Sequence, residues 1–298
     1  MTLAPRVVVV TRPTPYEELL AHHATRAQAE FFLKQRGQSL AALEAAHHRV
    51  HVTVAEVEAH IPLAWRRNRV PRVELDRFLF EPEDTIVVVG QDGLVANVAK
   101  YLVEQPVIGI NPTPEAFDGV LVPHRLEEGV RLLEPVARRE IEPMRRSMVS
   151  VVLDDGQTLC ELNELFLGHR SHQSARYELS LGEESATHSS SGVIVTTGTG
   201  ATGWARSIQR QRPSHIELPA PSEARLAFFV REAFPSQTTS TELSEGLLEA
   251  NAALELVSRM ESGVIFGDGI ESDYLRFDWG TRATVRLAER GLMWIAKA

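Results

Sequence analysis

The segment Gly90-Gln91-Asp92-Gly93 has residue types that suit phosphate chemistry. It follows residues 84–89 (DTIVVV), which predict a buried strand, and precedes residues 94–103, which predict a helix. Glycines at a strand–helix junction let backbone N–H groups approach phosphates. Asp92 cannot neutralise a phosphate, but it could accept a proton from an attacking hydroxyl or help to hold Mg²⁺. The alternative interpretation is an ordinary type I turn.

A second candidate is the loop at residues 196–204 (TTGTGATGW), in which three glycines and four threonines suit the binding of an anion. Residues 198–203 match G-x-G-x-x-G, the motif of nicotinamide-dependent oxidoreductases. That motif requires a βαβ unit, whereas here Pro213 shortens the helix and the flanking segments predict antiparallel strands. We therefore reject the oxidoreductase interpretation, and a flexible Gly/Thr loop remains the alternative.

The pair Asn163-Glu164 interrupts residues 158–167, an otherwise apolar run that predicts one strand. Neighbours in a strand face opposite sides, so one of the two is expected in a buried or ligand-facing environment. Asn163 can bind an adenine edge, and Glu164 can accept hydrogen bonds from ribose hydroxyls. The alternative is an edge strand that presents both residues to solvent. Further along, Gly267-Asp268-Gly269 predicts a hairpin turn.

Metal-binding and hydrolase motifs give no assignment. The pairs His22-His23 and His47-His48 are adjacent residues, so neither pair has the spacing of zinc ligands on one helix face. Cys160 is the single cysteine, which excludes a cysteine-rich zinc site. The sequence contains neither a Walker A motif nor a G-x-S-x-G motif. We assign no residue directly as a metal ligand.

The first half of the chain alternates strand and helix patterns, which predicts an α/β domain with a parallel sheet. Helices are expected at residues 16–60, with a break near Gly37, and at 94–103 and 127–141. The expected strands are residues 6–11, 70–75, 84–89 and 106–110.

The second half is rich in strand patterns joined by hairpins, and Asp154-Asp155-Gly156 is a strong hairpin signal. The expected strands are residues 148–153, 158–167, 176–181, 192–197, 225–230, 263–266, 274–277 and 284–287. The change of pattern near residues 138–146 predicts two domains, an α/β domain at 1–140 and a β-rich domain at 141–298.

Composition and charge limit the partners. The chain has 298 residues, 43% of them hydrophobic, and a net charge of -9, which disfavours nucleic acid or an anionic membrane as the main partner. No apolar run approaches the roughly 18 residues that span a bilayer. The start, MTLAPRVVVV, does not resemble a signal peptide. We expect a cytoplasmic protein.

Taken in order, these segments resemble the NAD kinase family. Its pattern is a Gly-Gly-Asp-Gly loop, an Asn-Glu pair, a Gly/Thr-rich loop and an Asp-Gly turn near the C-terminus, which match Gly90–Gly93, Asn163-Glu164, residues 196–204 and Asp268-Gly269. The Thr-Gly-Thr-Gly form of the loop is similar to that of mitochondrial-type NAD kinases and their bacterial relatives. Segments 7–19, 33–51, 106–115 and 175–181 look similar too, so the resemblance covers almost the whole chain.

The resemblance implies an N-terminal α/β domain, a β-rich NAD-binding C-terminal domain, and last residues that return to the first domain. It implies ATP with Mg²⁺ as phosphate donor, NAD as acceptor, and a homodimer or higher homo-oligomer. By the same resemblance, Asp92 is the base that receives the proton of the adenosine 2'-hydroxyl. Asn163 and Glu164 bind the adenosine portion of NAD.

Further positions follow from the same comparison with the family. Those that line the NAD pocket are Thr202, Trp204 and Ser207. Those that approach phosphates of ATP or NAD are Gly90, Gln91, Gly93, Thr199 and Gly200. Gln91 replaces the second glycine of the family's loop, and its side chain could donate a hydrogen bond to a phosphate or block one. Ser191 stands where many bacterial members have Asp.

Two alternatives within the superfamily stay open. The first is a non-catalytic protein that binds NAD(H) or ATP on the same fold, for which Gln91 is the main support. The second is a lipid kinase, because diacylglycerol and sphingosine kinases share the Gly-Gly-Asp-Gly loop. The Asn-Glu pair disfavours a lipid kinase, as does the lack of a basic or amphipathic membrane-docking stretch. The residues do not distinguish NAD from NADH, or ATP from polyphosphate.

Overall fold

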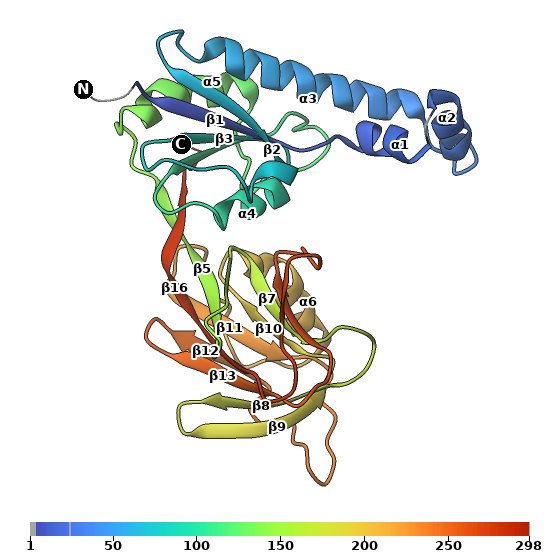
Figure 1. The fold of residues 1–298 in the computed structure, drawn as a ribbon, viewed down its shortest axis with the longest axis vertical. Helices are drawn as coiled ribbons and strands as arrows, with labels where there is room; N and C mark the ends of the chain where they lie inside the picture. Colours follow the sequence, from blue (N-terminus) through green and yellow to red (C-terminus); the bar gives the residue numbers. More distant parts are fainter. Residues whose placement is uncertain (1–3, 24, 298) are drawn as a thin grey trace. The chain divides into compact units, whose positions relative to one another are not determined.

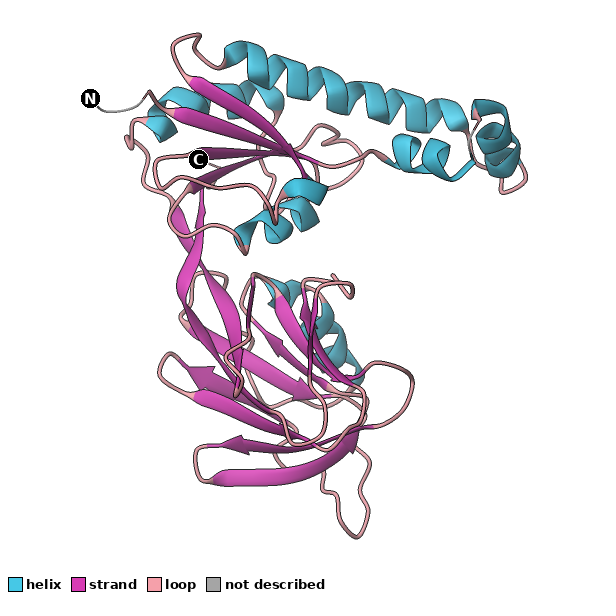
Figure 2. Cartoon of the chain, in the orientation of Figure 1, coloured by secondary structure: helices cyan, strands magenta, loops and turns pink. Residues whose placement is uncertain are grey.

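Residues 4–23 and 25–297 are described by a computed structural model, in which two groups of segments form separate units (Figure 1). The first unit contains the described residues up to Met144 and those from Met293 onward, and the second contains Arg145–Leu292. Helices dominate the first unit and strands dominate the second (Figure 2). Within the described residues, no helix is both long and apolar enough to cross a membrane.

The first unit is built on a parallel sheet. Strand β1 (Arg6–Thr11) lies between β2 (Arg66–Pro71) and β3 (Thr85–Val89), and β3 pairs with β4 (Pro106–Ile110). The four valines of β1 are fully buried, as expected of a strand that is covered on both faces. The end of β16 (Arg282–Trp294) pairs in parallel with β4 and adds a further strand to this sheet.

Helices cover both faces of this sheet. Apolar residues of α3 (Leu40–His60) and α5 (Leu126–Ala137) pack against alternate residues of the strands, while α4 (Asp92–Ala99) lies on the opposite face (Figure 1). Two short helices, α1 (Pro15–His23) and α2 (Arg26–Lys34), pack against the first turns of α3 in a small separate core.

The second unit consists of two antiparallel sheets that share one hydrophobic core. One sheet contains β5 (Met144–Leu153), β6 (Thr158–Glu161), β8 (Ala175–Leu181), β9 (Glu184–Ser190), β13 (Ala253–Ser258) and the first part of β16. The other runs in the order β12 (Glu245–Glu249), β11 (Arg225–Val230), β10 (Val193–Thr196), β7 (Glu164–His169), β14 (Gly263–Gly267) and β15 (Tyr274–Arg276).

Successive side chains of β7 pack into two different hydrophobic cores, one on each face of the sheet. Leu165 and Leu167 point into the core between the sheets, whereas Phe166 faces the other side and packs with Trp204 of α6 (Trp204–Gln211). Strand periodicity therefore fixes which face of this sheet carries the helix that follows the Gly/Thr-rich loop.

The predicted fold class is confirmed, with local corrections in the first unit. The strands expected at 6–11, 84–89 and 106–110 are present. The strand expected at 70–75 is wrong, because the strand is Arg66–Pro71 and Arg72–Glu74 forms a 3₁₀ turn. Strand β2 pairs on one side only and exposes polar side chains, which hides it from a hydrophobicity pattern. The helix expected at 94–103 spans Asp92–Ala99, and the one expected at 127–141 spans Leu126–Ala137.

In the second unit, the single strand expected at 158–167 is wrong. The chain bends at Leu162 and Asn163, so β6 ends at Glu161 and β7 begins at Glu164. Strands β9, β12 and β13 are present but were not expected. The other predicted strands are present, and the last of them is part of the longer β16.

Candidate functional site

The strand–helix junction of the first unit carries the predicted Gly-Gln-Asp-Gly loop. Strand β3 ends at Val89, and α4 begins at Asp92, with two residues between them. Gln91 is exposed and has an extended backbone, with φ -109° and ψ 164°, which any L residue adopts without strain. The departure from the family pattern therefore carries no backbone penalty at this position.

Asp92 is a half-buried residue in the first turn of α4, where a negative charge is favourable. Its Oδ1 accepts hydrogen bonds from the backbone N–H groups of Leu121 (2.7 Å) and Val122 (3.1 Å). Its Oδ2 accepts one from the N–H of Val120 (3.0 Å), so it retains a second acceptor position. Asp92 thus anchors the 120–122 segment and keeps one oxygen able to take another proton or a hydrogen-bond donor.

In the second unit, the bend between β6 and β7 presents the predicted pair Asn163 and Glu164. Their side chains are half-buried, and no hydrogen bond is found to either side chain within the part of the chain that the structure describes. Their backbones, in contrast, are held on both sides. The carbonyl of Asn163 accepts the N–H of Thr197, and that of Leu162 accepts the Thr197 hydroxyl at 2.7 Å.

Asp268 holds the same bend from the opposite side. Its carboxylate accepts hydrogen bonds from the N–H groups of Leu162 (2.9 Å), Asn163 (2.7 Å) and Glu164 (3.3 Å). Asp268 has φ 50°, a left-handed conformation that aspartate tolerates better than most residues. The predicted hairpin turn at 267–269 is present between β14 and β15, but its aspartate fastens the Asn-Glu pair, a role that the sequence reasoning missed.

The carboxyl groups around the bend influence one another. Burial, and to a smaller extent the nearby negative charge of Asp268, together raise the pKa of Glu164 to about 7. Burial also raises the pKa of Asp268, although three N–H donors and a hydrogen bond with the buried side chain of Glu161 oppose that shift. Near neutral pH, Glu164 can therefore exist in either protonation state.

The Gly/Thr-rich loop packs tightly against this bend. Residues 196–201 are buried, and a Cβ atom on Gly200 would lie 2.2 Å from the carbonyl oxygen of Asn163. The N–H groups of Thr199 and Gly200 donate to the hydroxyl of Thr197 at 3.1 and 3.2 Å, so both predicted phosphate-approaching amides are used internally. The Thr199 hydroxyl is buried and has no partner among the residues that the structure describes. The interpretation as a flexible loop is wrong.

An aromatic wall follows the loop. Trp204 stacks on Phe166 with ring centroids 6.0 Å apart and an interplanar angle of 9°, and the guanidinium of Arg231 lies 4.9 Å from the Trp204 ring. These three residues, with Ser191 and Phe266, line a pocket of about 510 Å³ in the second unit. A flat aromatic surface beside a cation suits a nucleotide base and its phosphates.

Two other predicted residues lie on the exposed side of the same region. Thr202 is exposed, and its hydroxyl donates to the Thr199 carbonyl at 3.4 Å. Ser207 is exposed on α6, and its hydroxyl donates to the Gly203 carbonyl at 3.4 Å. Both hydroxyls make only long bonds within the chain, so a ligand could displace those bonds at small cost.

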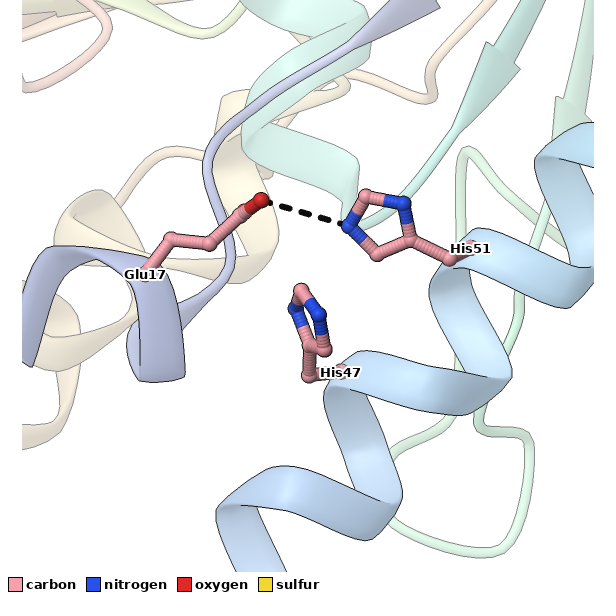
Figure 3. Close-up of side chains that lie close together, drawn as sticks. All are labelled: Glu17, His47 and His51. Atoms are coloured by element: carbon pink, nitrogen blue, oxygen red, sulfur yellow. Dashed lines mark hydrogen bonds and ion pairs between the residues drawn. The ribbon is translucent and has the colours of Figure 1, made fainter. Parts of the chain in front are cut away.

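A different pair of histidines has the spacing that the two adjacent pairs lack. His47 and His51 lie four residues apart on α3, and Glu17 of α1 lies beside them (Figure 3). The i, i+4 spacing of His47 and His51 is present in the sequence beside the adjacent pair His47-His48.

Comparison with known proteins gives two kinds of match. No known family profile matches the chain. "NAD kinase 2, mitochondrial" of Rattus norvegicus is 26% identical, over 71% of this chain and 62% of that protein; its Homo sapiens counterpart is also 26% identical, over 71% and 60%. The chain thus spans about three fifths of the length of these curated relatives.

Two solved structures share the fold. An NAD kinase from Archaeoglobus fulgidus in complex with ATP has a TM-score of 0.60 at 19% identity, and the match covers 98% of this chain and 93% of that one. A yeast NADH kinase complexed with NADH has a TM-score of 0.61 at 14% identity, covering 99% and 84%. At these identities the structural likeness concerns the fold.

Proposed function

We propose that this chain, whose fold and sequence similarity support assignment to the NAD kinase family, transfers the γ-phosphate of ATP to the adenosine 2'-hydroxyl of NAD. The observation that carries the proposal is the Asn163-Glu164 bend. Its backbone groups are bound by Thr197 and Asp268, whereas both side chains have no internal hydrogen bond in the described part of the chain. A rigid backbone that presents unpaired polar side chains is the arrangement expected of a binding site.

The residues of the second unit then act in NAD binding. The Asn163 amide would pair with an adenine edge, and the Glu164 carboxylate would accept hydrogen bonds from ribose hydroxyls. Trp204 and Phe166 would offer a flat apolar surface to a ring of the dinucleotide, with Arg231 nearby for its phosphates.

Asp92 would act in the transfer itself. The transition state of phosphoryl transfer is loose, so the hydroxyl proton leaves late and a carboxylate is a sufficient acceptor. The acceptor position left on Asp92 Oδ2 fits this task. It also fits a hydrogen bond from a water of hydrated Mg²⁺, the cation that would accompany ATP and neutralise charge on its phosphates.

The direct test is incubation of the purified chain with ATP, Mg²⁺ and NAD, with the product detected by an NADP-specific dehydrogenase. Reactions without ATP serve as the control. NADH replaces NAD in one parallel series, with the product measured as NADPH, and polyphosphate replaces ATP in another. NADP formation above the level without enzyme supports the proposal, whereas none with any donor or acceptor contradicts it.

A second candidate function is non-catalytic binding of NAD(H) or ATP. The observation that favours it is the set of three backbone N–H bonds to the Asp92 carboxylate, which would also be expected of a purely structural residue. Calorimetric binding of NAD together with no NADP formation would support this candidate over the kinase.

A further inference from the structure

A group of side chains in the helical part of the first unit lies outside the predicted kinase residues. Glu17 of α1 and His47 and His51 of α3 lie close together, and each offers one potential ligand atom within 4.8 Å of the other two (Figure 3). Glu17 and His47 are half-buried, and His51 is more exposed. Two imidazoles and one carboxylate form a donor set that is typical of zinc.

The distances are close to those of a coordinated ion. Ligands bound at about 2.0–2.1 Å in a tetrahedral arrangement lie roughly 3.4 Å from each other. The Glu17 Oε1 and His51 Nε2 atoms are already 3.3 Å apart. The i, i+4 spacing brings the His47 and His51 rings to a centroid separation of 4.2 Å. The three ligand atoms lie within 4.8 Å of one another, so the set would contract to roughly 3.4 Å around a bound ion.

The buried residue Thr14 orients two of the three ligands. Its hydroxyl lies 2.9 Å from His47 Nδ1 and donates to Glu17 Oε2 at 3.1 Å, and its backbone N–H donates to the same oxygen at 2.8 Å. A hydroxyl that donates to Glu17 favours the neutral His47 tautomer with its proton on Nδ1, in which Nε2 can bind a metal ion. Such outer partners fix the tautomer and orientation of metal-binding histidines.

We propose that Glu17, His47 and His51 bind a divalent transition-metal ion, with Zn²⁺ as the preferred ion. Glu17 and His51 also line a pocket of about 520 Å³, from which water can supply the fourth ligand. The ion would join α1, which has no buried residue of its own, to α3. Its binding energy would therefore stabilise the attachment of these two helices.

The experiment is calorimetric titration of Zn²⁺ into the full chain after chelator treatment and dialysis, with Co²⁺ absorption as a report on coordination geometry. We expect one equivalent to bind and Co²⁺ to give the bands of a tetrahedral site. Glu17→Gln, His47→Ala and His51→Ala should each weaken binding at least about tenfold. His48→Ala, an exposed neighbour on the same helix, is the matched control and should bind as the wild type does.

Thr14→Val tests the same site without removal of a ligand. It retains the side-chain shape but removes the hydroxyl, so we expect weaker binding than in the wild type and stronger binding than in His51→Ala. The far-UV circular dichroism of every variant is compared with that of the wild type. Undiminished stoichiometric binding in the double variant His47→Ala/His51→Ala, an equal loss in His48→Ala, or no binding by the wild type would each overturn the proposal.

Discussion

Asp268 Oδ1 lies 2.7 Å from the backbone N of Asn163 and accepts its hydrogen. The two residues are 105 positions apart in the sequence, and the bond joins the β14–β15 turn to the bend that begins β7. The same carboxylate also holds the N–H groups on either side of Asn163. The conformation of the predicted NAD-binding pair therefore depends on a turn that is distant in sequence.

Replacement of Asp268 is expected to loosen this pair. Asp268→Ala leaves three backbone donors without their acceptor, which should lower the free energy of unfolding by about 3 kcal/mol. It should also raise the KM for NAD. Urea unfolding and steady-state kinetics measure the two effects, and Glu183→Ala, at an exposed turn, should stay within about 0.5 kcal/mol of the wild type. Wild-type stability of Asp268→Ala would show that the three bonds contribute little.

The raised pKa of Glu164 predicts that the free energy of unfolding depends on pH. The unfolded chain releases this proton near pH 4.5, whereas the folded chain keeps it until about pH 7. The folded state thus binds more protons in that window, so stability falls as pH rises through it, by up to about 3 kcal/mol. Glu164→Gln removes the titration and should show a smaller decline between pH 4.5 and 7. If the free energy of unfolding of the wild type and of Glu164→Gln declined equally with pH, the pKa of Glu164 would not be raised in the folded state.

The same group predicts the pH dependence of substrate binding. An ionised Glu164 accepts hydrogen bonds from ribose hydroxyls more strongly than a neutral one. The KM for NAD should therefore decrease as pH rises through about 7. In Glu164→Gln the KM should be higher than in the wild type, and its dependence on pH in this range should be weaker.

Asp92 is expected to matter for turnover. Asp92→Asn removes the negative charge that would receive the hydroxyl proton, so kcat should fall roughly 10²-fold or more. The asparagine amide oxygen can take the place of Asp92 Oδ1 and accept hydrogen bonds from the N–H groups of Leu121 and Val122. The fold should therefore be retained. Steady-state kinetics measure kcat, and the thermal midpoint of unfolding shows whether the variant is folded. Turnover near that of the wild type would remove Asp92 from the proposed chemistry.

Gly200 and Gly93 form a matched pair for a packing test. A Cβ at Gly200 would meet the Asn163 carbonyl at 2.2 Å, so Gly200→Ala should destabilise the second unit by about 2 kcal/mol or more. A Cβ at Gly93 meets nothing within 4 Å, and alanine in this helix should stabilise the protein by about 0.5–1 kcal/mol. Equal effects in urea unfolding would contradict the close approach at Gly200.

The apolar strands and the strand–helix junction were predictable because local pattern determines them. The valines of β1 and β3 form apolar runs that predict buried strands, and these valines are buried. Strand β3 ends at Val89, directly before Gly90, as expected. The edge strand β2 was misplaced because its arginines are exposed and only one neighbour pairs with it. No local pattern shows that a strand with exposed polar residues has found a partner.

The candidate residues were predictable as residue types, but their interactions were not. Asn163 and Glu164 were identified from their interruption of an apolar run, on the wrong assumption of a continuous strand. The bend arises from the bonds to Asp268 and Thr197, which are distant in sequence. The Glu17 partner of His51 is likewise separated from it by 34 positions, and only the fold brings the two together.

The return of the chain to the first sheet has a consequence during synthesis. Met293 and Trp294 pair with β4, Ile295 donates its N–H to Val107, and Trp294 Nε1 donates to the Leu121 carbonyl at 2.9 Å. A nascent chain that has reached Met144 has made the other strands of this sheet but lacks the one that covers β4. Until residues 293–294 have been synthesised, the edge of β4 lacks its partner strand and is open to pairing with other strands.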